Sequence, residues 1–153
     1  MSFRVYKMRR ESKDIPSVGI SCIRFDKEYL EQYKSMYNAA FRPMRKALDI
    51  KPYDWYNNSS LIMDISSDIY ILTEKNELIG SVACCGNEID DLFVSEFHRH
   101  KGYGRQLLIW AMDHIASCGY KEMVIHVAEW NQNAVQMYKK EGFEIVKIEI
   151  ISV

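Results

Sequence analysis

The N-terminal third of the chain changes from alternating hydrophobic and polar residues to a helical spacing. Residues 3–9 alternate and predict a β-strand, and residues 18–25 predict a second one. From residue 29 to residue 48, apolar side chains recur every three or four positions, which predicts an amphipathic helix. Asp26 precedes this stripe and is of a residue type that caps helix N-termini.

Pro43 lies inside the predicted helix and removes one backbone hydrogen bond, so we expect the helix to kink or break near Arg42. Residues 49–60 combine Pro52 with aromatic and polar side chains and predict a loop. A short helix over residues 60–66 is expected to follow it.

Three short strands are predicted in the middle of the chain. They cover residues 68–74, 78–85 and 88–95, with polar turn residues between them. The two-residue turn Gly86–Asn87 favours an antiparallel hairpin. We therefore expect an antiparallel meander.

The C-terminal part alternates helices and strands. A helix is predicted over 102–117, a buried strand over 121–128, a second helix over 132–141 and a last strand over 143–151. Because a helix joins strands 88–95 and 121–128, these strands should be parallel with a right-handed crossover. The pattern predicts an α/β fold, a mixed sheet with helices on both faces.

Composition agrees with one globular domain, and charge argues against two classes of partner. The chain has 153 residues, of which 48% are hydrophobic and 27% charged, so we expect a single domain over residues 1–153. A net charge of −1 argues against a nucleic-acid coat and a polybasic membrane surface. No apolar run approaches the roughly 20 residues that span a bilayer, and the N-terminal segment is charged, so we expect a cytoplasmic protein.

The cysteine pattern does not favour a metal site. Cys22, Cys84, Cys85 and Cys118 include no CxxC spacing. Adjacent strand residues point to opposite faces, which makes Cys84 and Cys85 a poor metal clamp. We expect buried free thiols and no metal.

The segment from Val94 to Arg105 carries a pattern suited to binding an anion. A strand ends there, a Gly-rich basic turn follows and a helix begins. A helix N-terminus offers unpaired backbone N–H groups, and glycine allows close approach of a ligand. The turn predicts a pyrophosphate-sized anion site, with an ordinary solvated loop as the alternative. The candidate residues are Arg99, His100, Lys101, Gly102, Tyr103, Gly104 and Arg105.

Known motifs narrow the class of this site. GxxxxGK[ST] and GxGxxG are absent, which argues against a P-loop NTPase and a Rossmann dinucleotide site. Residues 99–104 fit [QR]-x-x-G-x-[GA], and residues 131–143 fit N-x-x-A-x-x-x-Y-x-x-x-G-F. In this order, after a meander, the two motifs resemble the acetyl-CoA-binding region of the GNAT superfamily of N-acetyltransferases. The resemblance covers residues 68–146.

The resemblance implies a GNAT-like fold in which the parallel strands splay apart to admit the pantetheine arm of acetyl-CoA. It implies that Leu92, Phe93 and Val94 contact the cofactor, with the Leu92 backbone N–H facing the acetyl carbonyl. It also implies that backbone N–H groups of residues 99–104 hold the pyrophosphate and that Asn131 bonds the pantetheine arm.

Catalytic residues follow from the same resemblance. Tyr138 would be the general acid that protonates the departing thiolate, unless it is only a core tyrosine. Glu88 and His126 are candidate bases for the attacking amine, and Asp90 shares a strand face with Glu88 by period two. A solvated strand edge, a core histidine or a catalytic water are the alternatives for the base.

The acceptor side is less defined. The helical stripe 29–48 and the aromatic residues Tyr53, Trp55 and Tyr56 fall where the family builds its acceptor wall, although core packing or a dimer contact would also explain them. The acceptor would be a primary amine of a small molecule or peptide, with no role for nucleic acid or membrane.

One strand is missing from the usual family pattern. Members usually end with two strands after the second motif, whereas about ten residues follow Phe143 here. Strands 3–9 and 18–25, or a partner subunit in a homodimer, could supply the missing one. The leading hypothesis is direct acetyl transfer in a ternary complex, and a non-catalytic acyl-CoA-binding sensor or scaffold is the alternative.

Overall fold

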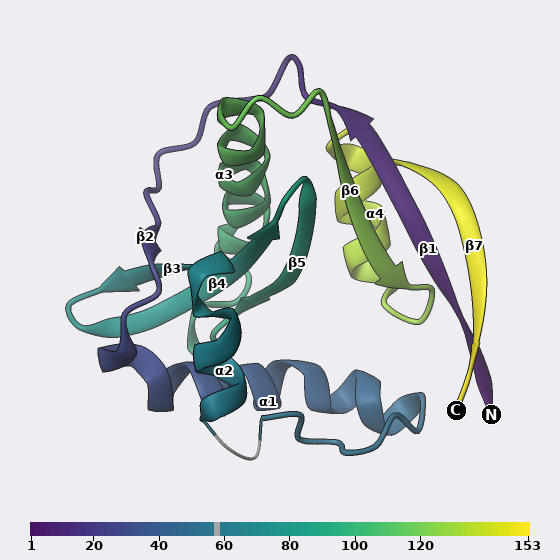
Figure 1. Cartoon of the computed structure of the whole chain (residues 1–153), viewed down its shortest axis with the longest axis horizontal. Coiled ribbons are helices and arrows are strands. Elements are labelled where there is room, and N and C mark those ends of the chain that lie inside the picture. The colour runs from purple at the N-terminus through teal and green to yellow at the C-terminus, as the bar shows by residue number, and fades with distance from the viewer. Residues whose placement is uncertain (57–58) are drawn as a thin grey trace.

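A seven-stranded sheet in the order β2-β3-β4-β5-β6-β1-β7 runs through the described residues, which are 1–56 and 59–153 of a computed structural model (Figure 1). Asn57 and Asn58, which fall in a predicted loop, lie outside the described residues. The strands are β1 (Ser2–Glu11), β2 (Ile23–Arg24), β3 (Ile69–Glu74), β4 (Glu77–Cys85), β5 (Glu88–Val94), β6 (Glu122–Ala128) and β7 (Glu144–Ser152).

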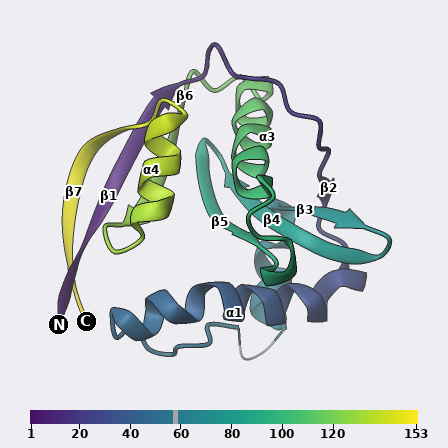
Figure 2. The same ribbon diagram turned by 180° about the vertical axis from the view of Figure 1, so that it is seen from behind.

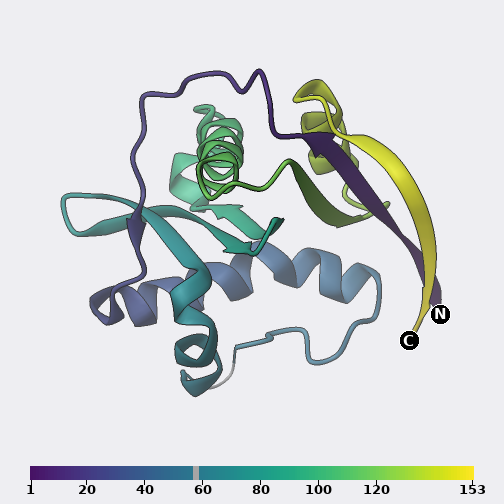
Figure 3. The ribbon, with the colours of Figure 1, turned by 45° about the horizontal axis from the view of Figure 1, so that its top comes forward.

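Four α-helices within the described residues cover the two faces of this sheet. They are α1 (Leu30–Ala47), α2 (Ser60–Ile65), α3 (Tyr103–Ser117) and α4 (Gln132–Lys140), and short 3-10 turns lie at Lys27–Tyr29, Ser66–Asp68 and Glu96–His98. Apolar side chains of α3 and α4 pack on one face, and those of α1 and α2 pack on the other. Figure 3 shows the sheet between these two pairs of helices. The predicted mixed sheet with helices on both faces is confirmed.

Helix α3 can lie close against β4 because Gly80 has no side chain. A Cβ atom at Gly80 would come 2.7 Å from Leu107 Cδ1 and 2.8 Å from the carbonyl oxygen of Phe93. Glycine therefore allows α3, which begins at the basic turn, to pack directly against the central strands.

The meander and the parallel pair are also as predicted. Strands β3, β4 and β5 pair antiparallel in sequence, and β5 pairs with β6 in parallel. Helix α1 runs beneath these strands, from the side of β3 and β4 towards the chain termini (Figure 2).

The predicted N-terminal strand joins the C-terminal part of the sheet as β1. It lies between β6 and β7 and is antiparallel to both. Met8 in its centre is fully buried, as expected for an interior strand. The two chain ends lie side by side (Figure 1), and the Val153 backbone N–H donates to the Met1 carbonyl oxygen at 2.9 Å.

The prediction of a strand over residues 18–25 is wrong except at its end. Only Ile23 and Arg24 pair, with β3. Residues 18–22 belong to an irregular connection from β1 to β2, in which Val18 and Ile20 pack against the apolar core under α3. Their alternation thus reflects packing against the core and not pairing with a neighbouring strand.

The helix does not break near Arg42, because α1 continues through Pro43 to Ala47. Proline removes the hydrogen bond to the carbonyl group of Ala39, four residues earlier. Both Pro43 and Ala39 are exposed, so water can satisfy that carbonyl group and the helix continues.

Candidate active site

Strands β5 and β6 run apart after a short stretch of pairing (Figure 1). Their register contains only Glu88 opposite Val124 and Ile89 opposite Ile125. Immediately beyond, β5 has a bulge against β4, where the register shifts between the Ala83–Asp90 pair and the Ser81–Phe93 pair. A bulge bends its strand and increases the local twist, which explains why β5 leaves β6 at this point.

The separation of the two strands opens a cavity of about 310 Å³ that both helical layers line. From one face of the sheet, α1 contributes Tyr37, Phe41, Met44 and Arg45; from the other, α4 contributes Ala134, Met137 and Tyr138. The cavity therefore passes through the sheet at the point where pairing stops.

Several residues selected from the sequence meet in this cavity. Leu92 from β5, His126 from β6, Asn131 from the turn before α4 and Tyr138 from α4 all line it, as does Asp90. Asn131 caps α4, since its Oδ1 accepts from the Ala134 N–H at 3.4 Å. This bond uses the amide oxygen and leaves the side-chain NH₂ group available to a ligand.

Tyr138 is buried between α4 and the sheet, with its ring 6.2 Å from that of Phe143. Burial, helped by the negative charge of Asp90, raises the pKa of the Tyr138 hydroxyl to about 12. The group is therefore a neutral proton donor throughout the physiological pH range.

Glu88 and His126 lie next to each other across the short parallel pairing. His126 Nδ1 is 2.6 Å from Glu88 Oε1, and both side chains are partly exposed. His126 lines the cavity, whereas Glu88 lies behind it at the paired end of β5. The two candidate bases thus form one hydrogen-bonded pair.

Asp91 is a cavity residue that the sequence analysis missed. Its φ angle is +48°, and its Oδ1 accepts from the Tyr37 hydroxyl at 3.2 Å. Burial, together with the neighbouring charge of Asp90, raises the pKa of the Asp91 carboxyl to about 7. Desolvation in the same concave region raises the pKa of Asp90, although its side chain still contacts solvent. Period two places Asp91 on the face opposite Asp90, but the bulge brings both into the cavity.

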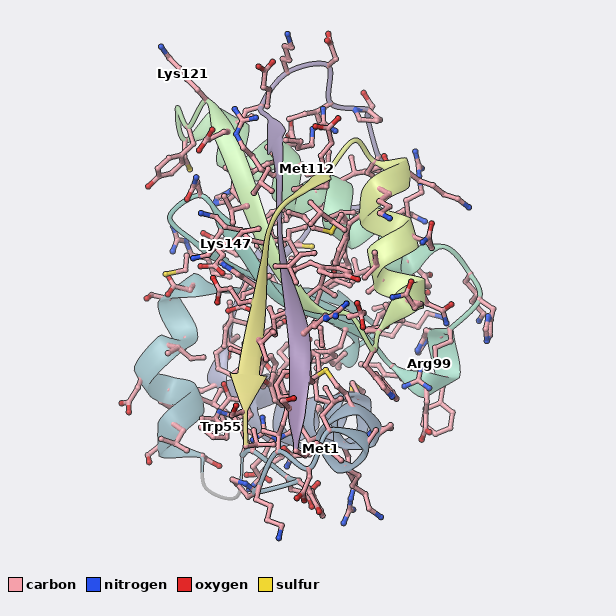
Figure 4. All side chains as sticks on the ribbon, turned by 90° about the vertical axis from the view of Figure 1, so that its right-hand side faces the viewer. Met1, Trp55, Arg99, Met112, Lys121 and Lys147 are labelled. Carbon is pink, nitrogen blue, oxygen red and sulfur yellow. The ribbon has the colours of Figure 1, made fainter. Side chains whose placement is uncertain are left out.

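The basic turn lies outside this cavity. Gly102 caps α3 with φ +83°, a left-handed conformation that glycine adopts without strain. Arg99, His100 and Lys101 are exposed before it, and Figure 4 shows Arg99 projecting at the surface. Arg99 lines a separate cavity of about 420 Å³ beside α1, together with Val94 and Phe97.

Four further candidates extend this turn into α3 or lie on β5. Tyr103 and Gly104 are partly buried in the first turn of α3, and Phe93 is buried in the aromatic core under α1. Arg105 Nε donates to Glu141 Oε1 at 2.6 Å, so the positive charge of Arg105 is paired with a carboxylate at the end of α4.

The residues predicted to form the acceptor wall lie in different places. Tyr37 and Phe41 from the helical stripe line the cavity, whereas the three aromatic residues after α1 do not. Tyr56 is buried in the core, Tyr53 bonds to Asp49, and Trp55 lies beside the Arg45 guanidinium.

The thiols only partly fit the expectation of burial. Burial raises the pKa of the Cys84 thiol to about 12, but Cys85 and Cys118 are exposed. In the described part of the chain, no group of three His, Cys, Asp or Glu side chains is arranged to hold a metal ion. None of the helices described there is long and apolar enough to cross a membrane.

Comparison with known proteins gives one consistent result. Residues 29–143 match the family described as Acetyltransferase (GNAT) family. A mycothiol acetyltransferase of Corynebacterium efficiens is 27% identical over 90 residues, which cover 56% of this chain and 30% of that protein. The L-ornithine N5-acetyltransferase of Arabidopsis thaliana is 32% identical over 62 residues, which cover 40% of this chain and 27% of that protein.

A solved structure shows the same fold. The PaiA N-acetyltransferase of Thermoplasma acidophilum, in complex with coenzyme A, superposes with a TM-score of 0.68 at 19% identity, covering 83% of this chain and 91% of that chain. The present chain spans less than a third of the length of the two curated relatives.

Proposed function

The chain belongs to the GNAT family of acetyltransferases, and we propose that it transfers the acetyl group of acetyl-CoA to the primary amine of a small molecule or peptide. The observation that carries this proposal is the cavity between β5 and β6, where Leu92, Asn131 and Tyr138 come together. We propose direct attack by the amine in a ternary complex, because no cysteine is among the described residues that line this cavity.

The residues present fit acetyl-CoA. Beyond Ile89, the β5 backbone has no β6 partner among the described residues, so its N–H and C=O groups can pair with a pantetheine arm. The first turn of α3, capped by Gly102, presents orphan N–H groups suited to a pyrophosphate. Acetyl-CoA would supply the acetyl group already activated as a thioester.

Groups of the chain itself would then stabilise the developing charge and transfer the protons. The Leu92 backbone N–H would stabilise negative charge on the acetyl oxygen. His126, held by Glu88, would take a proton from the amine as the C–N bond forms. As the C–S bond breaks, the Tyr138 hydroxyl would give its proton to the sulfur. Asp90 and Asp91 remain alternative proton acceptors in the same cavity.

Thermal melts with saturating acetyl-CoA test the first half of this proposal. Ligand at 100 times its Kd should stabilise the folded state by about 2.7 kcal/mol, a shift of several degrees. An Arg99→Glu variant should lose most of the shift. A Lys121→Glu variant makes the same charge change at the opposite end of the molecule and should keep it (Figure 4).

A thiol-release assay with a panel of primary amines tests the second half. Release of CoA that depends on the amine supports an enzyme. Binding of acetyl-CoA without turnover on any amine would instead indicate a sensor or scaffold. If acetyl-CoA shifts no melt, the proposal fails altogether.

A further inference from the structure

Arg45, near the end of α1, is held in one orientation at the wall of the cavity. Its Nε donates to the Pro52 carbonyl oxygen at 2.7 Å, and its guanidinium carbon lies 5.0 Å from the centre of the Trp55 ring. These two contacts fix the plane of the guanidinium group without using its two Nη groups as ion-pair donors.

No carboxylate neutralises Arg45 among the residues that the structure describes. Arg42, three residues earlier on the same helix, does have such a partner, since its Nη1 lies 3.7 Å from Asp54 Oδ2. Arg45 is partly buried, so its guanidinium loses part of its hydration with no carboxylate to compensate. A planar guanidinium in this state is suited to a bidentate bond with an anionic ligand.

An acidic side chain, Asp91 of β5, lies at the other end of the cavity, beside Tyr37 of α1. Tyr37, which bonds to Asp91, precedes Arg45 by two helical turns, so the two positions are about 12 Å apart along the axis. Phe41 and Met44 face the cavity between them. Along α1, the cavity therefore passes from an acidic end at the strand gap, over an apolar section, to a basic end.

We propose that the acceptor is a small aliphatic amino acid, whose carboxylate binds Arg45 and whose distal primary amine reaches the strand gap beside Asp91. This inference rests on the proposed acetyl transfer, because the amine is placed where the acetyl group would arrive. It makes Arg45 a residue that determines acceptor specificity.

Size and charge both favour this class. A cavity of about 310 Å³ is at the small end of ligand pockets, which span roughly 300–1,000 Å³, so it suits a metabolite better than a folded protein segment. A single guanidinium matches the single charge of a carboxylate. A phosphate monoester carries a charge of about −1.5 to −2 and would face Asp90 and Asp91 in the same cavity.

Acceptors that differ only in the carboxylate give a direct test. We expect 5-aminopentanoate to exceed pentylamine, and L-lysine to exceed cadaverine, by roughly 10- to 100-fold in kcat/KM, mostly through KM. An Arg45→Gln variant should reduce this preference to within about threefold. An Arg45→Lys variant keeps the positive charge but loses the planar group that can form a bidentate bond. It should give an intermediate preference.

Arg42→Gln is the matched control, because it loosens the same loop through Asp54 without touching the cavity. It should keep the full preference for the carboxylated acceptor. Equal kcat/KM for the two members of each pair in the wild type would overturn the inference, as would a preference that survives Arg45→Gln. With either of these two results amines would still be acetylated, so the acetyl-transfer proposal would stand and only the proposed class of acceptor would be wrong. If no amine releases CoA, the acetyl-transfer proposal fails and this inference falls with it.

Discussion

The two edges of β6 differ in how far they pair with the neighbouring strand. On one edge, β1 pairs with it continuously from Val5 opposite Ala128 to Glu11 opposite Glu122. On the other edge, β5 pairs at only two positions before it bends away. The edge against β1 buries apolar side chains such as Met8, while the edge towards β5 lines a cavity with polar groups.

This difference explains how an open strand edge can exist in the middle of a sheet. A strand with one free edge exposes unpaired backbone groups and is prone to fray. Here the continuous pairing with β1 holds β6 in place, so the open edge stays ordered and its backbone groups stay available. Stability should therefore depend on the β1 edge and activity on the β5 edge.

The largest expected effect separates activity from stability on the open edge. Tyr138→Phe removes the hydroxyl but keeps the packed ring, so it should lower kcat by about 10²–10⁴-fold. Steady-state thiol release would measure this loss, and the acetyl-CoA-induced melt shift should persist. A kcat within tenfold of the wild type would exclude Tyr138 as the general acid.

The next effect concerns stability on the closed edge. Met8→Ala leaves a void beside the fully buried side chains of the core and should lower the free energy of unfolding by about 2–5 kcal/mol. Urea denaturation followed by circular dichroism measures it. Met63→Ala on α2, whose side chain is 43% exposed, should cost under about 1 kcal/mol. Equal losses would show that β1 is not a principal support.

The carboxyl group of Asp91, at the open edge of β6, should make the free energy of unfolding depend on pH. The Asp91 pKa is about 7 in the folded protein and 3.8 as an ordinary value, so the folded state binds the extra proton between these pH values. The contribution of Asp91 to stability is thus fully present below pH 4, falls as pH rises to about 7 and is constant above.

Asp91→Asn should remove this dependence. Its stability relative to the wild type should rise between pH 4.5 and 7.5 by on the order of 1–2 kcal/mol, as measured by urea denaturation at several pH values. The control Asp113→Asn changes an exposed carboxyl on α3 and should run parallel to the wild type. A constant difference between wild type and Asp91→Asn would contradict a raised pKa at this position.

The smallest effect belongs to the surface of the closed edge. Arg9 on β1 and Glu122 on β6 form an ion pair with both side chains at least 40% exposed. Arg9→Met should lower the urea midpoint far less than Met8→Ala does, and high salt should reduce that difference further. A loss as large as that of Met8→Ala would mean that this pair does more than link two already paired strands.

Local signals in the sequence predicted much of the cofactor side. The turn before α3 and the segment around Tyr138 are short stretches whose spacing alone suggests strand ends and helix starts. The positions of these elements agree with the structure because neighbouring residues determine them. Their chemical roles stay predictions.

Features that depend on distant partners could not be predicted. The sequence shows a strand at residues 3–9, but its place between β6 and β7 depends on pairing with segments over a hundred residues away. The bulge that turns Asp91 into the cavity breaks the period-two rule on which its face would be assigned. The fixed orientation of Arg45 likewise requires Pro52 and Trp55 to fold back onto α1.

Because the two chain ends are adjacent, the order of the strands along the sequence could be changed without changing their order in the sheet. Because Val153 bonds to Met1, a short linker could join the two ends, and new ends could be opened in the connection between β1 and β2. In such a circular permutant β1 would follow β7, giving two strands after the second motif, as family members usually have. Every pairing in the sheet would be kept, so the arrangement of the strands in space would not depend on which strand comes first in the sequence.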